Sequence, residues 1–179
     1  KENIGAAYLS MAYKISKKTS AKLGLRYEYT NTNLGSDTQK DVVDRQYGNL
    51  FPSLFLLHTI NDNNAINLTY SRRIWRPGFF VLAPWVIFYD PKTFFTGNPA
   101  LQPEITDAVN ASYTYKNKMV SLSYSYTNHP ITNLYKIDEA TNRMIMAYKN
   151  SINNQFAYLS LSLPFNVKKW WTMQNTLNG

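Results

Sequence analysis

The sequence has no cysteine and only two histidines, His58 and His129. The lack of cysteine excludes disulfides, thiolate zinc sites and cysteine nucleophiles, and two histidines almost exclude a multi-histidine metal site. No run of about 18 apolar residues is present, so a transmembrane helix is not expected. The 7 glycines are scattered and form no phosphate-binding loop. We therefore expect no catalytic residues, no cofactor and no metal.

Aromatic residues are abundant where charged residues are scarce. The chain holds 14 Tyr, 9 Phe and 4 Trp, whereas charged residues make up only 17%, so its polarity comes from Asn, Ser and Thr. The net charge of +8 favours anionic partners such as nucleic acid or lipopolysaccharide. Lysine and arginine are spread along the chain and concentrate at expected turns rather than in one patch, so we expect no nucleic-acid partner.

Alternation of apolar and polar residues dominates the sequence. In residues 120–127, which read VSLSYSYT, every second residue is apolar or aromatic and the residues between are Ser or Thr. The same period of two runs through residues 21–30, 65–74, 105–115 and 155–163. A period of two is typical of strands, and no segment shows a convincing helical period. The sequence therefore predicts an all-β fold.

The predicted connections between strands are short at one end and long at the other. Short polar turns are predicted at 17–19, 61–64, 116–118 and 164–169. Longer connections are predicted at 31–46, 77–103 and 128–135, and a further hairpin is predicted to join 134–138 to 143–149. Roughly nine strands result, in an antiparallel up-and-down meander. Short turns on one side and long loops on the other are typical of a large outer-membrane β-barrel.

The two faces of these strands differ in chemistry. One face is aliphatic in mid-strand with Tyr near the ends, and the other carries Ser, Thr, Asn, Lys, Arg and Glu. In a barrel the first face meets acyl chains and the second lines the interior. The alternative is a soluble antiparallel sandwich, with its apolar face in a core and its polar face in water. Alternation alone does not separate the two, but the small, hydroxylated polar face favours the barrel.

Three ordered stretches carry a family resemblance: YGNLFPSLFLLHTIND (47–62), INLTYSRRIWRP (66–77) and LAPWVIFYDPKTFFTGNPALQPE (82–104). They resemble the barrel region of TonB-dependent outer-membrane receptors, especially the Bacteroidetes-type outer-membrane β-barrel group. The segments GLRYEYTNT (24–32) and LSLPFNVKKWWTMQN (161–175) are also similar to strand and turn sequences of this family.

The resemblance implies energy-coupled uptake of a nutrient, such as an iron siderophore, cobalamin, a glycan or a peptide, across the bacterial outer membrane. Such receptors have an N-terminal plug domain and a segment that engages TonB, and neither has a counterpart in this sequence. The family barrel has about 22 strands. We therefore expect residues 1–179 to be a single partial barrel segment with a long loop at 77–103. The expected partners are outer-membrane lipid and lipopolysaccharide, the TonB complex through the plug, and the nutrient ligand.

A second hypothesis is a non-transporting surface β protein with a structural or adhesive role. A plug with a TonB-engaging segment in the full-length protein would distinguish the two hypotheses. An incomplete barrel also has open edges and an unshielded apolar face. We therefore expect the isolated piece to fold as a curved or collapsed sheet that buries this face against itself or a second copy.

Three arginines, Arg72, Arg73 and Arg76, crowd the end of a strand just before the long loop. If that end is extracellular, they are candidates to bind lipopolysaccharide phosphates or an anionic ligand. The alternative is that they neutralise carboxylates inside the barrel or bind loop carbonyls.

The long loop is unusually aromatic. Its candidate ligand-binding rings are Trp85, Phe88, Tyr89, Phe94 and Phe95. Such rings stack on sugars or on siderophore rings, but they can equally pack together and give a long loop a core of its own.

The loop ends in GNPALQPE, residues 97–104. Proline cannot donate to a central strand ladder, so we expect this segment to end the loop and return the chain to a strand at Glu104.

Overall fold

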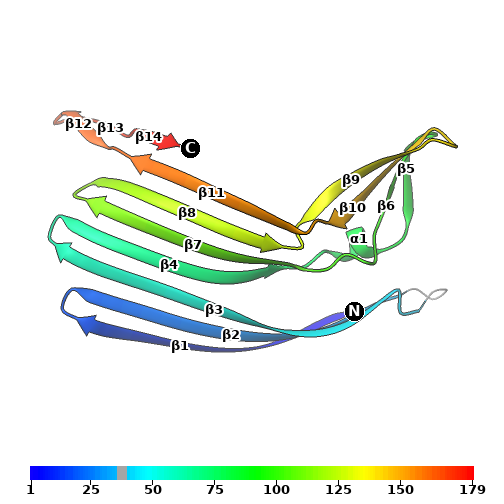
Figure 1. Cartoon of the computed structure of the whole chain (residues 1–179), viewed down its shortest axis with the longest axis horizontal. Coiled ribbons are helices and arrows are strands. Elements are labelled where there is room, and N and C mark those ends of the chain that lie inside the picture. Colours follow the sequence, from blue (N-terminus) through cyan, green and yellow to red (C-terminus); the bar gives the residue numbers. More distant parts are fainter. Residues whose placement is uncertain (36–39) are drawn as a thin grey trace.

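The computed structural model describes residues 1–35 and 40–179, and most of these residues lie in strands (Figure 1). The largest sheet has eight strands, each antiparallel to its neighbours. In spatial order they are β1 (Glu2–Ser16), β2 (Thr19–Leu34), β3 (Val43–Asn61), β4 (Asn64–Trp75), β7 (Glu104–Tyr115), β8 (Lys118–Asn128), β11 (Asn153–Ser162) and β14 (Thr176–Asn178). The predicted all-β antiparallel meander is confirmed.

The long connections form a second sheet of four strands. In spatial order these are β5 (Val86–Asp90), β6 (Thr93–Thr96), β10 (Arg143–Asn150) and β9 (Ile131–Asp138). The β9–β10 hairpin was expected, but β5 and β6 were not, and β6 pairs with β10 in parallel. A short helix, α1 (Phe79–Leu82), and a hairpin of β12 (Phe165–Lys168) and β13 (Trp171–Met173) complete the described elements. No described helix has the length and apolar character to cross a membrane.

The two ends of the large sheet differ as predicted. Two-residue turns join β1 to β2, β3 to β4 and β7 to β8, at positions 17–18, 62–63 and 116–117. These turns lie at the left end in Figure 1, and the second sheet extends from the other end. We call these the short-turn end and the long-loop end.

The strands present one apolar face and one polar face. Along β2, Leu23, Leu25 and Tyr27 are exposed on the apolar face, while Glu28 and Thr30 alternate with them on the polar face. Exposed residues of the apolar face include Leu9, Met11, Tyr13, Leu23, Leu25, Tyr27, Tyr29, Leu50, Ile66, Val109, Tyr113, Leu122, Tyr124 and Leu159. This arrangement matches the wall of an outer-membrane barrel, in which one sheet separates lipid on its apolar face from the barrel interior on its polar face. We refer to the large sheet as the wall.

The expectation that the piece would bury its apolar face against itself is wrong for the described residues. The large sheet stays a single curved layer (Figure 1), and its apolar side chains remain exposed. The physical reason is the continuous antiparallel ladder from β1 to β11, because folding the sheet onto itself would break rows of backbone hydrogen bonds. Association with a second copy stays a prediction.

A small core lies at the long-loop end. Val43, Leu82 and Leu101 are buried there, with Leu34 and Tyr148 among the partly buried residues that pack on them. These residues come from β2, β3, β10 and the connection between β4 and β7. The core therefore joins three long connections into one body at this end of the sheet.

Candidate functional site

The aromatic loop builds part of its own core. The Phe95 ring is 7% exposed and stacks on Phe80, with ring centroids 5.5 Å apart, and it meets Tyr148 edge-on at 5.9 Å. Trp85 packs on Phe80 at 5.2 Å and donates its indole N–H to the Phe80 carbonyl at 3.1 Å. Phe95 is thus a packing residue, because its ring is enclosed by aromatic neighbours.

Other rings of the same loop remain open to solvent. Phe88 and Tyr89 are 63% and 65% exposed on β5, which is an edge strand of the second sheet. Phe94 lies opposite Phe88 on the neighbouring strand β6, with ring centroids 5.7 Å apart, and Trp85 is about half exposed. The loop therefore both packs internally and presents rings, and the sequence alone did not separate the two groups.

Arg72 does not face the polar side of the wall. The strand alternation places it on the apolar face, where its guanidinium lies 3.3 Å from the Asp107 carboxylate on β7. The Tyr70 hydroxyl donates to the same carboxylate at 2.6 Å. Asp107 therefore neutralises Arg72 on the apolar face rather than inside the barrel, where the alternative placed such carboxylates, and the Nε of Arg72 has no hydrogen-bond partner among the described residues.

Arg76 is also paired within the wall. It donates to Glu28 at 2.6 Å and to Thr30 at 2.9 Å, and its guanidinium lies 6.0 Å from the Tyr47 ring centroid. Glu28 is 4% exposed and also pairs with Arg26. Burial alone would lower the pKa of Arg76, but the hydrogen bonds to Glu28 and Tyr47 outweigh it and raise this pKa above its ordinary value.

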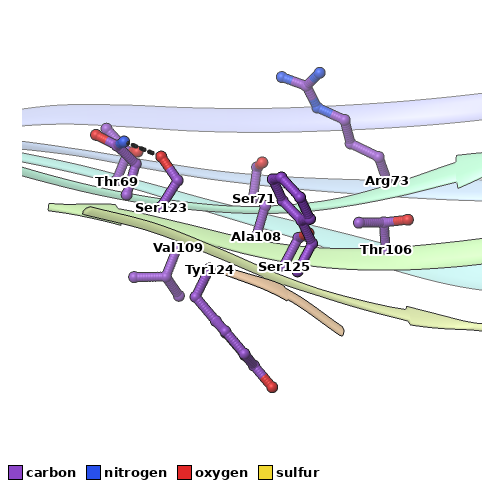
Figure 2. Close-up of a pocket in the computed structure, with 11 residues that line it drawn as sticks. Thr69, Ser71, Arg73, Thr106, Ala108, Val109, Ser123, Tyr124 and Ser125 are labelled. Carbon is purple, nitrogen blue, oxygen red and sulfur yellow. Dashed lines mark hydrogen bonds between the residues drawn. The ribbon is translucent and has the colours of Figure 1, made fainter. Parts of the chain in front are cut away.

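Arg73 differs from its two neighbours. It lies on the polar face, its side chain is exposed, and it has no hydrogen bond or ion pair with any residue within 1–35 or 40–179. A hollow of about 360 Å³ lies on one side of it and another of about 390 Å³ on the other. Figure 2 shows Arg73 above the first hollow, with Val109 and Tyr124 pointing to the opposite face of the sheet.

The floor of the first hollow is hydroxylated. Its polar side chains are Thr69, Ser71, Thr106, Asn110, Ser123 and Ser125. The Asn110 amide donates to the Ser123 hydroxyl at 2.6 Å, drawn as the dashed line in Figure 2. Phe156 of β11 lines the same hollow. A free guanidinium over hydroxyl groups, with a ring beside them, is suited to a polar or anionic ligand.

The segment 97–104 joins the loops to each other. A Cβ on Gly97 would lie 1.9 Å from the Ala83 carbonyl oxygen, so only glycine fits there without movement of the backbone. The backbone N–H of Asn98 donates to the Val81 carbonyl at 2.7 Å, and its side-chain amide donates to the Tyr148 carbonyl at 2.9 Å. The predicted loop-ending role is confirmed, since β7 begins at Glu104.

Two residues that hold this segment were not identified from the sequence. Arg45 on β3 donates to the carbonyls of Leu101 and Pro99. Asn150 accepts from the Gln102 N–H at 2.8 Å and donates to the Gln102 carbonyl at 3.0 Å. Their partners lie 48 to 56 residues away in the chain, so no local pattern could have indicated them.

No described group of three or more His, Asp or Glu side chains is arranged to hold a metal ion.

Residues 1–179 match the family model described as the outer membrane protein beta-barrel family. No curated protein sequence matches the chain. The structure is similar to the siderophore receptor PirA from Pseudomonas aeruginosa, with a TM-score of 0.79 and 13% identity over 99% of this chain and 34% of that one. It is also similar to a mutant of the ferric enterobactin receptor PfeA from Pseudomonas aeruginosa, with a TM-score of 0.67 and 16% identity over 99% of this chain and 26% of that one.

A third similar structure is a double mutant of the Serratia marcescens hemophore receptor HasR in complex with its hemophore HasA and heme. Its TM-score is 0.66, with 16% identity over 93% of this chain and 32% of that one. The chain thus spans about a third or less of the length of each of these proteins. At such identities the likeness shows the shared fold.

Proposed function

Because the chain belongs to the outer membrane protein β-barrel family, we propose that it forms part of the wall of a TonB-dependent receptor that imports a nutrient across the bacterial outer membrane. The observation that carries this proposal is the single-layer meander, whose apolar side faces outward and whose long connections are tied together at one end. Residues 1–179 act as a single partial barrel segment, and the plug belongs to another part of the receptor.

Tyrosines near the two ends of the strands support a position in the membrane. On β7, Tyr113 and Tyr115 lie near the short-turn end, and Tyr124 and Tyr126 on β8 lie nearer the long-loop end. Aromatic girdles flank the apolar band of outer-membrane barrels, whose short turns are periplasmic and whose long loops are extracellular. The second sheet therefore belongs to the extracellular part of the receptor, the hollows beside Arg73 lie on the interior face of the wall, and the apolar face meets outer-membrane lipid and lipopolysaccharide.

The polar face and the loop rings are the proposed ligand-facing surfaces. Arg73 supplies a cation that has no ion-pair partner within residues 1–35 and 40–179, and Phe88 and Tyr89 supply exposed rings. The substrate classes that fit are siderophores, cobalamin, glycans and peptides, and the siderophore and hemophore receptors among the similar structures support a ligand that delivers iron. Transport energy would reach the barrel through the plug and the TonB complex, and we propose no catalytic step.

The test is genetic complementation with the full-length receptor in its native bacterium. A strain without the gene is grown with each nutrient class as the limiting supply, and it is complemented either with the intact receptor or with a receptor lacking its TonB-engaging segment. We expect the intact receptor alone to restore growth on one class. A full-length protein without a plug, or equal growth with both versions, would overturn the proposal in favour of a structural or adhesive surface protein.

A further inference from the structure

The connection from β4 to β7 folds onto the polar face of the wall. Glu28 and Thr30 lie on that face, because the exposed apolar residues of β2 alternate with them. Arg76, the first residue after β4, reaches both of these side chains and passes over the Tyr47 ring of β3. The Arg76 side chain therefore crosses β3 on the interior side of the sheet and ties the beginning of the connection to β2.

The end of the connection rests on the same face. Arg45, which is paired with Thr32 in the β2–β3 ladder, binds the carbonyls of Pro99 and Leu101. Val43, two residues before Arg45 on the same face, packs with Leu101 and Leu82. We call residues 76–101 the strap, since both of its ends lie against the interior face of β2 and β3.

The strap changes the exposure of the wall beneath it. Thr30 is fully buried, and Glu28 and Thr32 are 4% and 6% exposed. Lys22 and Arg26 lie on the same face of the same strand, closer to the short-turn end, and both are exposed. A single-layer wall leaves the polar side chains of its face open to solvent, so the burial of Glu28 and Thr30, which Arg76 contacts, reports the position of the strap. Thr32 is covered both by this end of the sheet and by Glu2 of β1, whose carboxylate accepts from its hydroxyl at 2.9 Å.

Two features of the Arg76–Glu28 ion pair reduce the cost of breaking it. Glu28 pairs with Arg26 as well as with Arg76, and the Arg26 side chain is half exposed. Breaking a buried pair is costly mainly because it leaves a buried charge without a partner. Glu28 keeps Arg26 when Arg76 leaves, and the Nε of Arg76 is buried without a hydrogen-bond partner among the described residues. Both features lower the cost of releasing the strap.

We propose that the strap is a gate on the interior of the receptor, and that the Arg76–Glu28 ion pair is the latch that holds it against the wall. The proposal rests on the import function proposed above, because an interior gate has a role only if a solute passes along this face. With the latch closed, the polar stripe of Glu28, Thr30 and Thr32 is covered, and with the latch open it becomes part of the passage.

The experiment measures access to the covered stripe in the full-length receptor on intact cells. This chain has no cysteine, so Thr32→Cys, with any cysteine elsewhere in the receptor replaced, provides a reporter under the strap. A membrane-impermeant maleimide labels this cysteine at a rate that follows the population of the open strap. We expect slow labelling with the latch intact and labelling at least about tenfold faster with R76Q or E28Q, because each removes one partner of a buried pair.

The matched control is R72Q, which removes the neighbouring arginine of β4 from its ion pair on the opposite face. It should leave the labelling rate unchanged, and R76K, which keeps the charge, should raise the rate less than R76Q. The proposal is overturned if R76Q and E28Q label like the parent receptor, or if R72Q accelerates labelling as much as they do. If R76Q does not assemble in the membrane, R45Q takes its place, because Arg45 holds the other end of the strap. R45Q should then label faster than the parent receptor and R72Q, and a labelling rate equal to theirs overturns the proposal.

Labelling does not require transport, so the two proposals fail separately. Faster labelling in a receptor that restores no growth refutes the import function alone. TonB-dependent growth with unchanged labelling of R76Q refutes the gate alone.

Discussion

Replacing Gly97 with alanine tests the packing of the long-loop end most sharply. The added Cβ would lie 1.9 Å from the Ala83 carbonyl oxygen and 3.1 Å from the Val81 carbonyl oxygen, and both are backbone atoms that cannot rotate away. The backbone N–H of the next residue, Asn98, donates to the same Val81 carbonyl at 2.7 Å. Moving the chain to admit the methyl group therefore also breaks a hydrogen bond between α1 and the segment 97–104.

The magnitude follows from these two contacts. Overpacking a well-packed site costs about 1–3 kcal/mol, and losing the hydrogen bond costs about 1 kcal/mol. The local opening free energy of β6 and the segment 97–104 should fall by about 2–4 kcal/mol, which is a loss of roughly 30- to 1,000-fold in protection from amide exchange.

The assay is hydrogen exchange with mass spectrometry on the full-length receptor in detergent. The control is G78A in the same connection, where a Cβ would meet nothing within 4 Å. G78A should leave protection of this region within about threefold of the parent receptor. The reasoning is refuted if G97A is as protected as the parent, or if G78A loses as much protection as G97A.

The remaining predictions concern the loop contacts and pH. N150A should lower protection of residues 100–104 by about tenfold, because it removes the side chain that binds both polar groups of the Gln102 backbone. F95A should lower the melting temperature of the second sheet, because it removes a buried ring. F88A should leave this melting temperature unchanged and weaken ligand binding, because the Phe88 ring is exposed. Equal melting temperatures for the two variants would contradict the division into packing and ligand-facing rings. Hydrogen bonds from Thr141 and Ala140 lower the pKa of Asp138 from its ordinary value of 3.8, so they stabilise the β9–β10 tip above that pH and are lost as the pH falls below it. The protection factor of the tip amides, which is their exchange relative to the intrinsic rate at the same pH, should therefore fall in acid, and D138N should remove this pH dependence.

The main sheet was predictable because its signal is local. Alternation along residues 120–127 and 105–115 gave both the strands and the side of the sheet on which each residue lies. The same rule also separates Arg72 from Arg73, since consecutive strand residues point to opposite faces. Treating three nearby arginines as one cluster overlooked that rule. The resemblance to the barrel region of TonB-dependent receptors is confirmed by the family match and the similar receptor structures.

The second sheet was not predictable in the same way. The β5 residues VIFYD and the β6 residues TFFT are apolar on both faces, so they show no period of two. The second partner of β6 is β10, which lies about fifty residues further along the chain, and this pairing is parallel, which no local turn signal indicates. The ties made by Arg45 and Asn150 depend on the same long-range arrangement. The sequence could therefore indicate an aromatic, self-packing loop but not the partner that completes its sheet.

The central claim is that this meander is a barrel wall with lipid on one face and the receptor interior on the other. The most direct test is a scan of single spin labels along β8, residues 119–127, in the full-length receptor in a bilayer. Collision with oxygen, which concentrates in lipid, should peak at Val120, Leu122 and Tyr124, and collision with a water-soluble nickel complex should peak at Ser121 and Ser123. Nickel accessibility that is equal at odd and even positions, with no oxygen peak at Leu122, would contradict the account.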